Sequence, residues 1–168
     1  MAEKALVGIL MGSDSDLPVM EEAAKVLKNF NIPFEMTISS AHRTPHRTAQ
    51  FARNAEKRGI RVIIAGAGSA AHLAGFIAAE TTLPVIGVPI DASPLNGLDA
   101  LLSTVQMPGG VPVASMAIGK AGAKNAGIFA VQILSTADEK LHEELKKYRK
   151  EMAKQVEEKA KKLKAQIG

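Results

Sequence analysis

The chain has 168 residues, of which 46% are hydrophobic and 23% are charged, and it contains no cysteine. This composition is typical of one globular domain with a core of its own, and it excludes disulfide bonds, thiolate metal sites and cysteine nucleophiles. The net charge of +4 lies mainly in residues 138–168, which hold ten Lys or Arg and seven Asp or Glu. Mixed charges of this kind are typical of a solvated helix, and aromatic residues are few, so we expect no nucleic-acid partner.

The N-terminal apolar run is short and is followed at once by acidic residues, which is unlike a signal peptide. No stretch of the sequence approaches the ~20 apolar residues that a membrane helix needs. We therefore expect a cytoplasmic protein with no membrane partner.

Apolar runs alternate with amphipathic segments along the first 134 residues. Continuous apolar runs predict buried strands at 5–12, 32–38, 61–69, 83–90 and 111–118. Helical spacing of apolar residues predicts helices at 17–30, 44–58, 69–79, 97–104 and 123–134. Thr44 before Pro45 is typical of a helix start, and Ser69 is expected to cap the third helix. This alternation predicts an α/β fold in which helices cover both faces of one parallel sheet.

The last segment has a single apolar stripe. Its members recur at steps of three and four residues: Leu141, Leu145, Tyr148, Met152, Val156, Ala160 and Leu163. A helix over 137–165 would be about 43 Å long, more than the width of a compact body of this size. We therefore expect a homo-oligomer in which the stripe packs on another copy. Residues 1–168 would form one domain, with an α/β core (1–136) and a helix (137–166) for oligomer contacts.

Polar residues follow the first two predicted strands, and in an open parallel sheet ligands bind at this edge. The loop GSDSD (12–16) offers Ser13, Ser15 and Asp16 at a helix start, which suits a phosphate and a ribose, although simple helix capping explains the same residues equally well. In SSAHRTPHR (39–47), His42 and Arg43 precede the second helix. Arginine suits phosphate or carboxylate, whereas a lone histidine is more often structural. His46 and Arg47 fall on the exposed first turn of the helix and receive no catalytic role.

The third strand runs into GAGSAAH (66–72). Gly66 and Gly68 would let the backbone approach a ligand, a helix start at Ser69 would supply N–H groups, and His72 would lie at the same rim. The histidines lack the close spacing and carboxylate partners of a metal site. Together these loops predict acid–base chemistry on a small phosphorylated molecule, without a metal.

Four long motifs carry a resemblance to a known family. GSDSD, SAHRTP, GAGSAAHLAGFIAAETTLPVIGVP and LDALLSTVQMPGGVPVASMAIG occur in this order and closely resemble the class I N5-carboxyaminoimidazole ribonucleotide mutases of purine biosynthesis, over roughly residues 5–135. The related class II enzymes carboxylate aminoimidazole ribonucleotide directly with CO2 and carry Lys where Arg43 stands, so Arg43 favours the mutase. The resemblance implies a flavodoxin-like three-layer α/β/α sandwich with a five-stranded parallel sheet and an extended C-terminal helix.

The resemblance also implies an octamer and a carboxylate shift from N5 to C4 that needs neither metal, ATP nor redox cofactor. Functional coupling to the ATP-dependent N5-CAIR synthetase would follow. His42 would transfer protons, and a single residue of near-neutral pKa can act first as acid and then as base. The implied substrate-binding residues are Ser13, Ser15 and Asp16 for the ribose 5-phosphate, Arg43 for phosphate, Gly68, Ser69, Ala70, His72 and Leu73 around the ring and CO2, and Gln106, Met107 and Pro108 in an enclosing loop.

Three alternatives stay open. The first is the class II carboxylase. The second is a module that binds FMN or a nucleotide, although the rim loops lack aromatic residues to stack on an isoalloxazine ring. The third is a scaffold held together by the terminal helix, which gives no reason for His42, Arg43 and His72 to share one edge.

Overall fold

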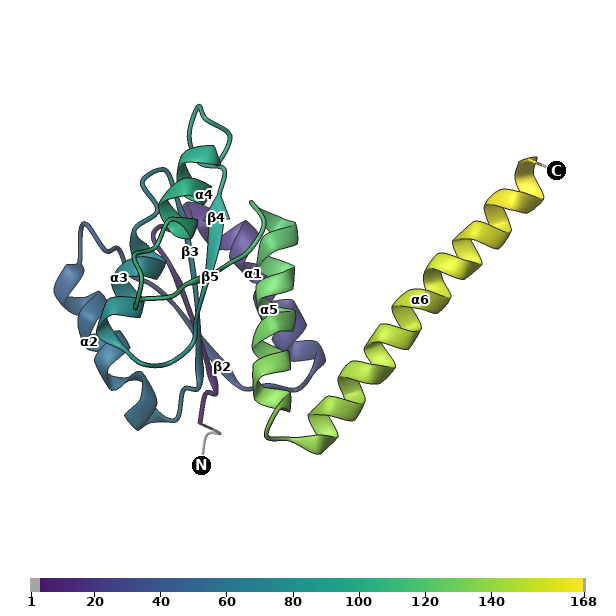
Figure 1. Cartoon of the computed structure of the whole chain (residues 1–168), viewed down its shortest axis with the longest axis horizontal. Coiled ribbons are helices and arrows are strands. Elements are labelled where there is room, and N and C mark those ends of the chain that lie inside the picture. Colours follow the sequence, from purple (N-terminus) through teal and green to yellow (C-terminus); the bar gives the residue numbers. More distant parts are fainter. Residues whose placement is uncertain (1–3, 168) are drawn as a thin grey trace. The chain divides into compact units, whose positions relative to one another are not determined.

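The structure is a computed structural model that describes residues 4–167, and the chain divides after Ala130 into two compact units. The first unit contains a sheet and its covering helices, and the second contains the end of α5 and the long helix α6 (Figure 1). The strands are β1 (Val7–Met11), β2 (Phe34–Ile38), β3 (Val62–Gly68), β4 (Val85–Ile90) and β5 (Ala114–Ser115). The helices are α1 (Leu17–Asn29), α2 (Pro45–Arg58), α3 (Leu73–Glu80), α4 (Leu98–Val105), α5 (Lys120–Ser135) and α6 (Glu139–Ile167).

The five strands are parallel and lie in the order β2-β1-β3-β4-β5. This is the flavodoxin-like order, in which the chain reverses its direction of travel across the sheet between β1 and β3. Helices α2 and α3 pack side by side on one face, and α1 lies with α5 on the other (Figure 1). The fold class expected from the sequence is therefore confirmed.

The central strands are apolar on both sides because helices cover both faces of the sheet. All residues of β1 and β4 are buried, whereas β2, at the sheet edge, is only partly buried. Burying one aliphatic side chain of this kind contributes about 1.5–3 kcal/mol, so the central strands hold the loops that follow them in fixed places. The cluster beneath α2 and α3 contains Leu10, Ala52, Ala55, Ile60, Ile63, Ala65, Leu73, Ala74, Ile77 and Val85.

Helix α2 starts at Pro45, as the sequence predicts, but the side chain of Thr44 does not cap it. The Thr44 hydroxyl instead accepts from the Ser40 N–H at 3.0 Å and donates to the Ser40 carbonyl at 3.1 Å. These bonds close the turn between β2 and α2. The helix ends at Arg58 and is capped by Gly59, whose φ of 100° gives the left-handed conformation that glycine adopts most readily.

Two other boundaries differ from the expectation. Helix α3 begins at Leu73, so the predicted start at Ser69 is wrong. Ser69 has a φ of 53°, a left-handed conformation that turns the chain out of β3 before any helix can form. The fifth strand is much shorter than 111–118, since only Ala114–Ser115 pair with β4.

Helix α6 covers most of the predicted 137–166 segment and has 29 residues. Asp138 accepts from the Leu141 N–H at 3.1 Å and caps its start. Three apolar side chains of the stripe are exposed by 37% (Met152), 66% (Val156) and 57% (Leu163), and Ile167, four residues beyond the stripe, is exposed by 78%. Within the described residues, no helix combines the length and the hydropathy that crossing a membrane requires.

Candidate active site

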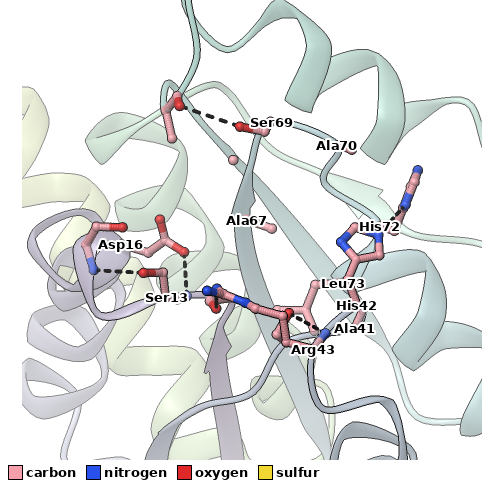
Figure 2. A pocket seen from close by; sticks show the side chains of 15 residues that line it. Ser13, Asp16, Ala41, His42, Arg43, Ala67, Ser69, Ala70, His72 and Leu73 are labelled. Atoms are coloured by element: carbon pink, nitrogen blue, oxygen red, sulfur yellow. Dashed lines mark hydrogen bonds between the residues drawn. The ribbon is translucent and has the colours of Figure 1, made fainter.

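A cavity of about 490 Å³ opens at the carboxyl edge of the sheet, beside the point where the strand order reverses. Open α/β sheets bind their ligands at this position. The loops after β1, β2, β3 and β4 all contribute to it (Figure 2). Its lining residues are Gly12, Ser13, Ser15, Asp16, Ser40, Ala41, His42, Arg43, Ala67, Gly68, Ser69, Ala70, His72, Leu73 and Ala92.

The cavity brings together the residues that the sequence nominated, except Gly66, Gln106, Met107 and Pro108. Gly66 packs against Met20 of α1 instead, so its predicted approach to a ligand is wrong. Met107 lies instead against α3, where a Cβ on Gly75 would be 3.0 Å from its sulfur, and Gln106 and Pro108 are exposed. Sequence reasoning missed Ser40, Ala41, Ala67 and Ala92, which also line the cavity. Small residues at or just beyond the carboxyl end of a strand were the available signal for all four.

Two opposite sides of the cavity have different chemistry. We call Gly12, Ser13, Ser15, Asp16 and Arg43 the arginine wall, and His42, Ala70 and His72 the histidine wall. Figure 2 shows Ser13 and Asp16 on one side and the two histidines on the other, with the Arg43 side chain extending toward the serine loop.

Asp16 is the most buried residue of the arginine wall, with 4% of its surface exposed. Its Oδ2 accepts from the Ser13 N–H at 3.0 Å, and the Ser13 hydroxyl accepts from the Ser15 N–H at 3.4 Å, which forms a capping box. Burial raises the pKa of Asp16, and hydrogen bonds from the backbone of Ser13 and Gly12 and the charge of Arg43 offset part of this rise. Ser13 and Asp16 thus cap this short turn of helix, as the capping interpretation of the loop expects, and its ligand-binding interpretation stays a prediction.

The carboxylate of Asp14 accepts hydrogen bonds from two donors of the same loop. Its Oδ1 accepts from the Ser13 hydroxyl at 3.0 Å and from the Ser15 N–H at 3.1 Å. The Ser13 hydrogen bond is the main cause that lowers the pKa of Asp14, followed by the bond from Ser15. A hydroxyl and an N–H that converge on one carboxylate oxygen form a site that suits an anion.

Arg43 connects the loops after β1 and β2. Its Nη2 donates to the Gly12 carbonyl at 2.9 Å, and its N–H donates to the Ser40 hydroxyl at 3.1 Å. A guanidinium has five N–H donors, so further donors remain for a ligand in the cavity. The bond to Gly12 therefore aims a positive charge along the serine loop.

The histidine wall is organised around one contact. Nε2 of His42 lies 2.7 Å from Nδ1 of His72, and the rings meet edge to face at 84° with centroids 4.9 Å apart (Figure 2). His72 directly precedes α3. Both histidines are exposed, and both line the cavity. The pair places two imidazoles, which can act as acid or base, opposite the arginine wall.

Small residues between the walls keep the backbone of neighbouring loops close together. A Cβ on Gly68 would lie 2.4 Å from the Cβ of Ala92, so only glycine fits there. The Ser69 hydroxyl donates to the Ala92 carbonyl at 3.5 Å and so connects the β3 and β4 loops. The residues of the described chain include no group of three or more His, Cys, Asp or Glu placed to hold a metal ion. The cavity therefore combines groups that can bind an anion, on the arginine wall, with groups that can transfer a proton, on the histidine wall.

Comparison with known proteins identifies the family to which the chain is similar. The family model described as AIR carboxylase matches residues 6–155. A protein of Pyrococcus horikoshii named N5-carboxyaminoimidazole ribonucleotide mutase is 60% identical over 162 residues, which are 96% of this chain and 90% of that protein. The phosphoribosylaminoimidazole carboxylase of Candida albicans is 57% identical over 146 residues, 87% of this chain but only 25% of the fungal one.

A solved structure agrees with these sequence matches. The crystal structure of Treponema denticola PurE superimposes with a TM-score of 0.83 at 30% identity and covers 92% of this chain and 95% of that one. The matched family model extends over the whole sheet and all cavity residues. The chain belongs to the AIR carboxylase family.

Proposed function

We propose that the chain is an isomerase of purine biosynthesis that converts N5-carboxyaminoimidazole ribonucleotide into 4-carboxy-5-aminoimidazole ribonucleotide. The observation that carries this proposal is the cavity in which the arginine wall faces the histidine wall. The Pyrococcus relative, named a mutase and 60% identical, supports the choice of reaction.

The arginine wall would bind the ribose 5-phosphate. Arg43 and the donors of Ser13 and Ser15 would contact the phosphate, and charge-assisted hydrogen bonds of this kind are the strong ones. Asp16 would accept from a ribose hydroxyl, because a carboxylate can accept more hydrogen bonds than the one that Ser13 donates. The imidazole ring would then extend toward His42.

His42 would act as acid and then as base. When the bond between N5 and the carboxylate carbon breaks, its electron pair stays on N5, and His42 protonates that nitrogen. CO2 would be held beside Gly68, Ser69, Ala70 and Leu73 until C4 attacks it and forms the new carbon–carbon bond. The C4 proton then passes to His42, which ends the cycle in the protonated form in which it began.

Direct carboxylation of aminoimidazole ribonucleotide is the second candidate, and the 57% identity to the fungal carboxylase favours it. The two reactions differ in the source of the carboxylate carbon. Substrate carrying ¹³C in its N5-carboxylate should give labelled product in unlabelled bicarbonate buffer if the chain is a mutase. Unlabelled product, or turnover only of aminoimidazole ribonucleotide with bicarbonate, would establish the carboxylase instead.

The working form would be a cytoplasmic homo-octamer, coupled in function to the ATP-dependent N5-CAIR synthetase and independent of metals and cofactors. In support, α6 exposes an apolar stripe, and a second exposed row consists of Leu95, Leu98, Leu102 and Val105. Gln106, Met107 and Pro108 follow this row and would enclose the cavity of a neighbouring copy. On this proposal residues 1–136 are the catalytic core of a single domain and 137–166 its oligomer-contact helix.

The assembly can be tested by removing most of α6. A chain ending at Lys146 lacks Met152, Val156, Leu163 and Ile167, so its particles should contain fewer copies than the full-length protein. Sedimentation measures this directly. An unchanged particle mass would contradict the role of α6 in assembly, and a full-length mass other than eight copies would contradict the octamer.

A further inference from the structure

We infer that His72 is a positioning residue that holds His42 in the tautomer with its proton on Nε2, so that Nδ1 of His42 is the atom that gives and takes the proton. This inference rests on the proposed function for the identity of the reaction, but its structural part does not depend on any substrate. It assigns a role to the contact between the two rings.

The contact determines which nitrogen of His42 remains available. Its Nε2 lies 2.7 Å from Nδ1 of His72, which is at the short end of the hydrogen-bond range. Nδ1 of His42 makes no hydrogen bond to any other residue that the structure describes. Of the two nitrogens, Nδ1 is therefore the one that can meet a ligand in the cavity.

The hydrogen bond needs a proton on only one of the facing nitrogens, because two N–H groups would repel. With the proton on Nε2 of His42, Nδ1 of His72 accepts, and Nδ1 of His42 is free to bind or release a proton. His42 can then alternate between imidazole and imidazolium at Nδ1 while the bond to His72 stays unchanged. The opposite arrangement would place the reactive lone pair of His42 against His72 and away from the substrate.

The backbone of His72 is suited to hold a neighbouring ring in place. Its N–H donates to the Ala70 carbonyl at 2.8 Å, and its carbonyl accepts from the Phe76 N–H in the first turn of α3 at 2.9 Å. His42 lies in the turn between β2 and α2, and its side chain is exposed. An exposed side chain samples several rotamers, and a catalytic geometry must be held within about 0.5 Å, so the ring of His42 needs this partner.

An uncharged partner also suits a residue that must act in both directions. A carboxylate in the place of His72 would add a full negative charge next to His42 and favour the imidazolium over the neutral form. A neutral imidazole orients the ring without adding this charge. Among the described residues, Asp16 on the arginine wall is the only carboxylate that lines the cavity, and Arg43 is the other Asp, Glu, Lys or Arg of its lining.

Two substitutions separate positioning from packing. His72→Leu keeps a side chain of similar size but has no acceptor, whereas His72→Asn places an amide oxygen where Nδ1 stands. We expect His72→Leu to lower kcat by about 10- to 100-fold with KM within about threefold of wild type, and His72→Asn to recover most of the loss. His46→Leu, on the exposed first turn of α2 and outside the cavity, is the matched control and should leave kcat unchanged.

Nuclear magnetic resonance of the substrate-free protein, labelled with ¹⁵N-histidine, gives the readout that is independent of activity. An Nε2–H proton of His42 that exchanges slowly with water is expected in wild type, His72→Asn and His46→Leu, and not in His72→Leu. A proton on Nδ1 of His72, or an undisturbed His42 signal in His72→Leu, would overturn the inference. If these signals behave as expected but the labelled-substrate experiment fails, only the proposed reaction is wrong.

Discussion

The two walls of the cavity are built in different ways. The arginine wall is stabilised by several hydrogen bonds to backbone atoms, since Asp16 is buried and holds the Ser13 N–H while Arg43 holds the Gly12 carbonyl. The histidine wall is exposed, and one side-chain bond between His42 and His72 organises it. On the proposed function, this difference would assign binding and chemistry to separate elements: the hydrogen-bonded loop of the arginine wall would recognise the ribose phosphate, and the histidine pair would face the reacting ring.

The largest effect should come from the histidine wall. His42→Asn removes the acid–base group but keeps a polar side chain, so kcat should fall by at least about 100-fold while folding and KM change little. His46→Asn is the matched control. Steady-state kinetics checks this, and retention of more than about a tenth of the wild-type rate would remove His42 from its assigned role.

A substitution in the arginine wall should act on binding instead. Arg43→Gln loses a charge-assisted hydrogen bond worth about 1.5–3 kcal/mol, which corresponds to a rise of KM by about 10- to 100-fold. Arg47→Gln serves as control, because Arg47 donates to Thr37 outside the cavity. A fall in kcat with unchanged KM would show that Arg43 acts in the chemical step and that the two walls are not separate in function.

Asp16→Asn should raise KM about tenfold through the weakened ribose contact, and it should also change how stability depends on pH. Burial raises the pKa of Asp16, so between the ordinary value of 3.8 and the raised value the folded chain binds a proton that the unfolded chain releases. Wild-type stability therefore falls as pH rises through this interval. The variant has no carboxyl that titrates at this position, so it does not lose stability in this way. The free energy of unfolding of the variant minus that of wild type should therefore increase as the pH rises from below 3.8 to neutral.

Urea denaturation at several pH values measures the Asp16 effect. A stability difference between variant and wild type that does not change across the interval would mean that the carboxyl is not penalised by burial. The KM of the same variant tests the ribose contact separately, and an unchanged KM would mean that Asp16 does not contact the ribose.

The smallest effect is expected at Asp14, whose carboxylate occupies the Ser13 hydroxyl and the Ser15 N–H. Asp14→Asn removes a negative charge next to the proposed phosphate position. Because Asp14 is exposed and screened by water, KM should fall by only about two- to fivefold. Isothermal titration with inorganic phosphate would check the direction without turnover, and weaker phosphate binding would contradict the assignment of this loop.

Much of the fold follows from the sequence because the strands are continuous apolar runs between turn residues. The convergence of Ser13, His42, Arg43 and His72 also follows, since the carboxyl ends of parallel strands share one edge. The start of α3 did not follow: serine is typical of helix caps and of turns alike, and only the left-handed backbone of Ser69 decides between them.

The contact between His42 and His72 could not be predicted either. The residues are thirty positions apart, and their distance depends on the length of two turns and on two side-chain rotamers. Gln106, Met107 and Pro108 lie outside the cavity of their own chain. On the proposed assembly they would complete a neighbour's cavity, and the sequence of one chain carries no pattern for such a contact.

A crystal structure with aminoimidazole ribonucleotide tests the division of labour between the walls most directly. We expect the phosphate against Ser13, Ser15 and Arg43, and C4 of the ring within hydrogen-bond reach of Nδ1 of His42. A nucleotide bound in the reverse direction, with its phosphate at the histidine pair, would contradict it.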